Sequence, residues 1–232
     1  MDRKDFWIHF TRATALVGAV GAACFFVAAV AAQIIRADND VLSDFVSDLA
    51  VGEQGGLMTT SFFLHGAAIV AVSLGLTRGV ARSRSHVASS ALIGLGGFGV
   101  LLLGLFPADA YDTPHHTVVG SVHIVLASIS FTALSVAFLL FSHAVRHDEH
   151  WHGFRPYALG LGWSAALAML TFSFAMGFDQ IGLVETSRFL GLLERILIAF
   201  ILAWILLTAL RLRRVACAHD HFMFEEGRVV AK

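Results

Sequence analysis

The chain has 232 residues, of which 57% are hydrophobic and only 14% are charged, and its mean hydropathy is +0.75. Ordinary soluble domains contain roughly 45–50% apolar residues, so the composition indicates an integral membrane protein. Sixteen basic residues face seventeen acidic ones, which excludes the clustered basic surface of a nucleic-acid-binding protein. Two cysteines without a CxxC motif exclude a disulfide scaffold and a thiolate zinc site.

Six apolar stretches are long enough to cross a bilayer, which takes about 20 residues of helix. They cover residues 14–35, 57–76, 88–106, 118–141, 157–174 and 191–210. Lipid offers no partner to backbone N–H and C=O groups, so each stretch is expected to be an α-helix. No linker divides the chain. We therefore predict one all-α domain over residues 1–232, a six-helix transmembrane bundle.

The orientation of the bundle is predicted from its basic residues, which are retained on the cytoplasmic side of membrane spans. Thirteen of the sixteen fall on one side: Arg3, Lys4, Arg12, Arg78, Arg82, Arg84, Arg146, Arg155, Arg211, Arg213, Arg214, Arg228 and Lys232. Only Arg36 and Arg188 fall on the other side. We expect a multi-pass protein of the cell membrane with both termini cytoplasmic, including a tail over residues 211–232.

The connection after the first span carries an amphipathic pattern. Apolar residues stand at positions 41, 42, 45, 46 and 49, and Ser43, Asp44, Ser47 and Asp48 lie between them. This spacing predicts a short helix lying on the outer surface. Its serines and aspartates are explained equally well by helix capping and by a role in a site.

Several polar residues lie within or beside the spans near the predicted outer face. His65 and His123 sit at similar depths in the second and fourth spans, and His116 precedes His123 by seven residues on the same helical stripe. A second polar stripe runs along the fourth span and consists of Ser121, Ser128, Ser135 and Ser142. Two polar stripes predict that this helix lies centrally and is the most enclosed. Glu194 and Arg195 open the last span. Ionisable groups in spans are costly and mark sites more often than not.

A histidine cluster also occupies the cytoplasmic connection after the fourth span, over residues 143–152. The His147/His150 pair has the spacing of two ligands on one helical turn. A solvated loop is the favoured reading, because no cysteine or second segment completes a coordination shell.

Four short motifs resemble a prokaryotic membrane family catalogued as domain of unknown function 998. They are Ser47-Asp48-Leu49, Phe106-Pro107-Ala108-Asp109, His116-x-x-x-Gly120-x-x-His123 and Gly191-x-x-Glu194-Arg195. The resemblance covers residues 16–210 and implies a six-helix hydrophobic core that carries these positions. It implies no established activity, and His65 is not among the matched positions.

Three functions remain open at this point. The first is a metal-assisted hydrolase or transferase acting on a membrane lipid. Its candidate catalytic residues are Asp48, Asp109, His123 and Glu194. Its candidate substrate-binding residues are Arg195 and Ser47. Its candidate ligands for a divalent metal such as zinc are His116, His123, Asp109 and His65.

The second function is a b-type haem electron carrier in which His65 and His123 are the axial ligands. The third is a non-enzymatic scaffold or transporter. The pattern of residues does not choose between an enzyme and a binding protein, and the oligomeric state is open.

Overall fold

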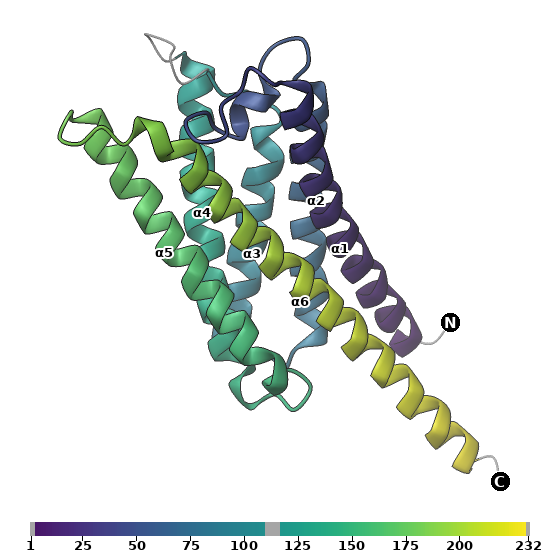
Figure 1. Ribbon diagram of the computed structural model, residues 1–232. Helices are drawn as coiled ribbons and strands as arrows, with labels where there is room; N and C mark the ends of the chain where they lie inside the picture. Colours follow the sequence, from purple (N-terminus) through teal and green to yellow (C-terminus); the bar gives the residue numbers. More distant parts are fainter. Residues whose placement is uncertain (1–2, 110–116, 231–232) are drawn as a thin grey trace.

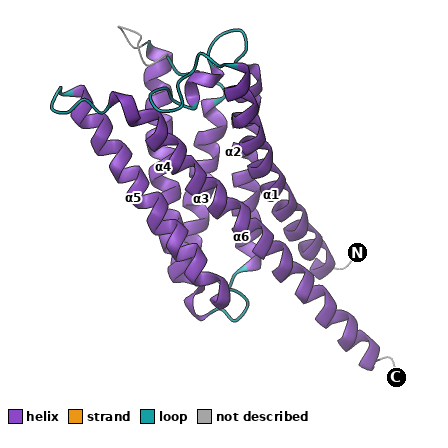
Figure 2. Ribbon diagram, in the orientation of Figure 1, coloured by secondary structure: helices purple, strands orange, loops and turns teal. Residues whose placement is uncertain are grey.

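The computed structural model describes residues 3–109 and 117–230, and within these ranges it contains helices and no strands (Figure 2). The long helices are α1 (Arg3–Ile35), α2 (Gly56–Gly79), α3 (Arg84–Leu103), α4 (Val118–Ala144), α5 (Arg155–Gln180) and α6 (Ser187–Val230). Three short 3₁₀ turns, η1 (Ser47–Ala50), η2 (Val145–His147) and η3 (His152–Phe154), lie in the connections. All six helices are long and apolar enough to cross a membrane. The predicted all-α, six-span fold is confirmed.

The helices form a closed ring in chain order. Each helix packs against the next, and α6 closes the ring by crossing against α1 (Figure 1). Because the number of helices is even, α1 begins and α6 ends at the same end of the bundle. We call that end, with connections 80–83 and 145–154, the basic end. The opposite end, with connections 36–55, 104–109 and 181–186, is the acidic end.

Two helices are longer than the apolar stretches that predict them. Helix α1 begins at Arg3 instead of residue 14, and α6 runs to Val230 through the segment expected to be a tail. Hydrophobicity locates the part of a helix that lies in lipid, whereas the helix itself continues as long as its residues favour it. Arginine, leucine and alanine, which are frequent here, are among the best helix formers.

Large aromatic side chains fill the basic half of the bundle. Trp204 of α6 stacks on Phe138 of α4, with ring centroids 3.9 Å apart and planes at 10°, and its Nε1–H donates to the Ala158 carbonyl at 3.2 Å. Trp151, fully buried in the connection, donates to the Gly79 carbonyl at 2.8 Å. These contacts join four of the six helices at this end.

The expectation that the fourth span is the most enclosed helix is wrong. A larger share of α2 and of α3 is buried than of α4, and Ser121 and Ser128 of the serine stripe are exposed. The physical reason lies in the serines themselves. The Ser121, Ser130 and Ser142 hydroxyls each donate to a carbonyl four residues earlier in the same helix. The exposed Ser121 hydroxyl satisfied in this way needs no partner helix to hide it.

Candidate functional site

The connection between α1 and α2 folds inward over the acidic end. The amphipathic helix expected over residues 41–49 is in the structure a single 3₁₀ turn, η1, and Ser47 and Asp48 in it are buried instead of facing solvent. The turn has no side-chain N-cap, and its backbone is held by other segments. Arg36 at the end of α1 donates to the Asp48 carbonyl at 3.1 Å and to the Val51 carbonyl at 2.8 Å.

Arg195 of α6 is the main anchor of this connection. Its Nη1 donates to the carbonyls of Asp44 and Gly191, and its Nη2 donates to Gln33 Oε1 at 2.7 Å and to Asn39 Oδ1 at 3.1 Å. Gly191 brings the connection onto α6, because a Cβ at this position would collide with the Asp44 backbone. Four acceptors within the protein occupy the guanidinium edge that an anionic ligand would need.

Two carboxylates lie against consecutive peptide groups of the same connection. The Phe45 N–H donates to Asp48 Oδ2 at 2.9 Å, and the Val46 N–H donates to Glu194 Oε2. Both side chains are buried, and Asp48 Oδ1 has no hydrogen-bond partner among the described residues. Burial raises the pKa of the Asp48 carboxyl to about 6, and the Asp44 carboxylate adds to the rise, while the Phe45 N–H opposes it.

Asp109 closes the turn between α3 and the start of α4. Its Oδ2 accepts the Thr117 N–H at 2.6 Å and its Oδ1 accepts the Thr117 hydroxyl at 2.8 Å, and Thr117 in turn caps α4 through the Gly120 N–H. The carboxylate lies directly over Gly120, where a Cβ would collide with it. The motif residues Asp109 and Gly120 therefore fit each other.

His123 lies one turn further along α4 and is oriented by the same turn. Its Nδ1 is 2.7 Å from the Phe106 carbonyl, and its ring meets the edge of Phe62 at a centroid distance of 6.5 Å. A carbonyl can only accept, so Nδ1 of a neutral ring carries the proton and Nε2 is left as the basic atom. The side chain is 5% exposed.

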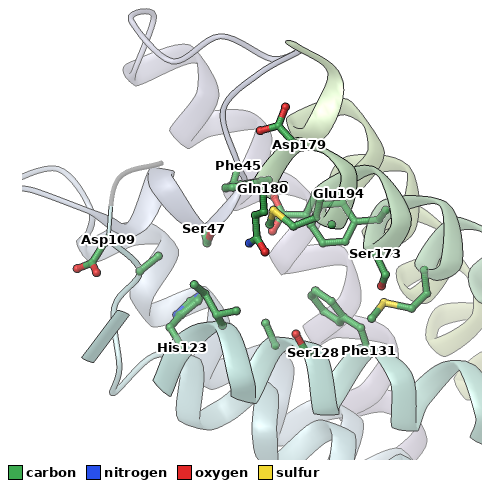
Figure 3. Close-up of a pocket in the computed structure, with 17 residues that line it drawn as sticks. Phe45, Ser47, Asp109, His123, Ser128, Phe131, Ser173, Asp179, Gln180 and Glu194 are labelled. Atoms are coloured by element: carbon green, nitrogen blue, oxygen red, sulfur yellow. The ribbon is translucent and has the colours of Figure 1, made fainter. Parts of the chain in front are cut away.

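A cavity of about 570 Å³ opens between α4, α5, α6 and η1 at the acidic end (Figure 3). Its charged and larger polar lining residues lie toward that end, namely Ser47, Asp109, His123, Asp179, Gln180 and Glu194, whereas Ser128 and Ser173 lie beside Phe131. Its apolar lining includes Ile124, Ala127, Phe131, Met169, Phe172 and Met176. One cavity thus joins a polar head region to an apolar wall.

The cavity exists because α5 leans away from α4 toward the acidic end, as Figure 1 shows. Near the basic end α5 is packed through its small residues Ala158, Gly162 and Ala165, whereas Ala175 is its only buried residue nearer the acidic end. Sequence reasoning missed the contribution of α5, including Ser173 and Gln180. This helix carries no charged residue between Arg155 and Asp179, so neither charge nor a histidine pointed to it.

Four of the predicted site residues line the cavity together, namely Ser47, Asp109, His123 and Glu194. Three others lie outside it. Asp48 is buried within the connection, where its Oδ2 accepts the Phe45 N–H, and Arg195 lines a separate apolar groove between α1 and α6. His65 is packed against Phe25 at a centroid distance of 4.9 Å, with its Nδ1 unpartnered among the described residues. His116 falls outside the described residues.

The family of this chain is known from a comparison with family models. A family model described as protein of unknown function (DUF998) matches residues 19–211. The chain belongs to the DUF998 family. No match was found among curated proteins or among solved structures.

The four motifs of this DUF998 member converge on the acidic end from different parts of the chain. The Ser47-Asp48-Leu49 segment lies in η1, the Phe106 carbonyl orients His123, and Gly191 lets the α1–α2 connection approach α6 at Asp44. Together they shape the wall of one cavity. The sequence predicts similar depths for these residues near one face, and the contacts give the physical cause of their gathering.

A metal ion in this region would need several side-chain ligands that converge on one point. Among residues 3–109 and 117–230, no three His, Cys, Asp or Glu side chains are grouped so as to hold one. Both oxygens of Asp109 are engaged by Thr117. The described residues do not complete a zinc site, which usually needs at least three protein ligands, and the predicted zinc site that includes His116 stays a prediction.

Proposed function

We propose that this protein binds an amphiphilic lipid of the cell membrane in the cavity at the acidic end and acts on the lipid's polar headgroup. The observation that carries the proposal is the division of the cavity lining. Ser47, His123 and Glu194 lie toward one end, whereas Phe131 lies away from it and is accompanied by two small polar residues, Ser128 and Ser173 (Figure 3). The lining also includes Met169 and Phe172 of α5. Ligand sites have mostly apolar linings with a few converging polar groups.

The divergence of α5 from α4 supports a route of entry from the bilayer. The side chains that line this gap are apolar or small, among them Ile124, Ala127 and Met169. A lipid chain passing between the two helices would exchange one apolar surrounding for another. Its headgroup would remain at the level of the polar residues, where it needs no transfer through the hydrocarbon layer.

His123 is the group we assign to headgroup chemistry. With Nδ1–H held by the Phe106 carbonyl, Nε2 is the basic atom of the neutral ring. In a hydrolysis, Nε2 takes a proton from water as the water oxygen bonds to the headgroup ester, and it returns that proton to the leaving oxygen as the ester bond breaks. In a transfer reaction, a hydroxyl group of a second lipid replaces the water.

The test separates binding from chemistry. The protein is reconstituted in nanodiscs made from a total bacterial lipid extract, and retained lipids and products are identified by mass spectrometry. Ala127→Trp fills the cavity and is expected to abolish retention, whereas Val125→Trp, on an exposed position of the same helix outside the cavity lining, is the matched control. Equal retention by both variants would contradict the binding proposal.

His123→Gln tests the chemistry. It is expected to retain the lipid and to lose product formation by roughly 10²–10⁴-fold, the usual contribution of a general base. Unchanged turnover would remove His123 from the reaction. Loss of turnover with a chelator and its recovery with zinc would instead favour the metal-assisted mechanism, and a Soret band in the purified protein would favour the haem carrier.

A further inference from the structure

The basic end contains a second cavity, which the proposed function does not use. It has a volume of about 260 Å³ and lies between the α2–α3 connection and the end of α4. Its lining consists of Ala81, Arg82, Ser83, Ser85, His143, Ala144, Arg146, His147 and Asp148. A water molecule in the liquid takes up about 30 Å³, so the cavity has room for a group the size of a phosphate.

The side chains around this cavity are mostly hydrogen-bond donors. Arg82 and Arg146 supply two guanidinium groups, and His147 supplies a further imidazole ring. Arg146 Nη1 faces both ring nitrogens of His143, so the imidazole accepts from the guanidinium and these two side chains are held together. Arg82 has no hydrogen-bond or ion-pair partner among the described residues. Guanidinium groups form paired hydrogen bonds with phosphate oxygens.

The single acid in the lining, Asp148, is already engaged. Its Oδ2 accepts the Ala81 N–H at 3.2 Å and its Oδ1 accepts the His150 N–H at 3.0 Å. Asp148 therefore joins the two connections that form the cavity walls. Two arginines against one carboxylate leave the cavity with a net positive charge.

The cavity also lies at the start of α3. Ser83 is the N-cap, and its hydroxyl accepts the His86 N–H at 3.1 Å. The N–H groups of Arg84 and Ser85, in the first turn of this helix, have no partner within it. The helix dipole adds a partial positive charge at this position.

We infer that this cavity binds the phosphate of an anionic phospholipid headgroup at the basic end of the bundle. Basic pockets between transmembrane helices are suited to such headgroups, because the ligand's acyl chains stay in the bilayer while its phosphate meets the arginines. A free phosphate ion shares the same chemistry. The lipid is favoured here because the cavity lies where α3 begins and α4 ends, both of which are long and apolar enough to cross a membrane, and lipid headgroups lie at the ends of such spans.

The inference is tested by titrating the detergent-purified protein with phosphatidylglycerol or phosphatidylcholine and counting bound lipids by native mass spectrometry. Arg82→Gln/Arg146→Gln is compared with Arg213→Gln/Arg214→Gln, which removes two exposed arginines of α6 outside the cavity. We expect phosphatidylglycerol to bind more tightly than phosphatidylcholine, and the cavity pair to weaken it by roughly ten-fold or more. The control pair should change it less than two-fold.

Several results would overturn the inference. Equal weakening by the two pairs would mean diffuse attraction to a basic surface, and no preference for phosphatidylglycerol would mean no site. Inorganic phosphate that competes at low millimolar concentration, with no lipid preference, would assign the cavity to a soluble phosphate. Since the acidic-end cavity is unaltered in both pairs, lipid retention there is scored separately with Ala127→Trp.

Discussion

Asp148 at the basic end and Asp48 at the acidic end are both aspartates in connections between helices, but their carboxylates have different surroundings. Both oxygens of Asp148 accept backbone N–H groups, from Ala81 and His150. Asp48 uses only Oδ2, toward Phe45, and its Oδ1 is buried without a partner among the described residues. Asp148 therefore joins backbone segments to one another. Asp48 instead keeps one buried oxygen without a hydrogen bond, which costs folding free energy.

The same contrast extends to the helices around the two residues. At the basic end Trp151, Trp204 and Phe138 fill the space between helices. At the acidic end α5 leaves α4, and the space between them is a cavity bordered by His123 and Glu194. Close packing at one end provides the stability that lets the other end remain open, and costly polar groups in such open regions are typical of functional sites.

The largest effect is expected for Trp204→Ala, which breaks the packed end. The substitution removes the stack on Phe138 and the hydrogen bond to the Ala158 carbonyl, and large-to-alanine changes in a core cost about 3–5 kcal/mol. Thermal unfolding in detergent is expected to shift accordingly. Lipid retention in the acidic-end cavity of the folded fraction should be unchanged. A loss of retention without a loss of stability would contradict the division between the two ends.

Arg195→Ala is expected to have the next largest effect, a loss of about 3 kcal/mol. It removes the donors to Gln33, Asn39 and Asp44 and leaves these acceptors beside α6 without them. If Arg195 is an anchor, Arg195→Lys recovers part of the stability and the proteolytic resistance of residues 36–51. If Arg195 instead binds an anionic ligand, the alanine variant would keep its stability and lose lipid binding.

Some of these features could be predicted from the sequence, and others could not. The six spans could be predicted because lipid requires long apolar helices, and His123 and Glu194 could be singled out because polar groups in spans are rare. The partners of Arg195 could not be predicted. Gln33 and Asn39 are ordinary polar residues at the end of a span, and only the folded connection brings them to α6.

The different roles of similar side chains were equally hidden. Ser47 and Asp48 are neighbours in one motif, yet Ser47 lines the cavity and Asp48 is buried outside the lining, against the Phe45 N–H. A difference of one residue in a 3₁₀ turn rotates a side chain by about 120°. The serine stripe of α4 misled for a related reason, because the hydroxyls bond to their own helix.

Asp48→Asn is expected to stabilise the protein at pH 7 by up to roughly 3 kcal/mol. The pKa of Asp48 is raised to about 6 from the usual 3.8, mainly by burial, and each pKa unit corresponds to about 1.4 kcal/mol. Below pH 4 the folded and unfolded chains are both protonated and nothing is lost. Between about pH 4 and 6 the folded chain keeps a proton that the unfolded chain releases, so stability falls as the pH rises.

The measurement is the difference in unfolding free energy between Asp48→Asn and the unaltered protein, followed from pH 4 to 8. The difference should grow between about pH 4 and 6 and then stay constant. Asp38→Asn is the matched control in the same connection. Its side chain is 75% exposed and 3.6 Å from Arg36, and exposed pairs contribute at most about 1 kcal/mol. A difference for Asp48→Asn that is independent of pH would show that its burial does not control its titration.

The smallest effect is expected for Asp148→Asn, the counterpart of that substitution at the basic end. The amide keeps one acceptor oxygen and places an NH₂ group near either Ala81 N–H or His150 N–H, so one hydrogen bond of about 1 kcal/mol is lost. The same change removes the only negative charge from the cavity of Arg82 and Arg146. Stability should therefore fall slightly while the affinity for phosphatidylglycerol rises a few-fold, and lipid retention at the acidic end stays constant.

The two effects are measured by thermal unfolding and by native mass spectrometry. Opposite signs of the two effects would show that the Asp148 carboxylate holds the connections together and does not contribute to ligand binding. A fall in both quantities would mean that Asp148 shapes the phosphate cavity more than its charge opposes the ligand.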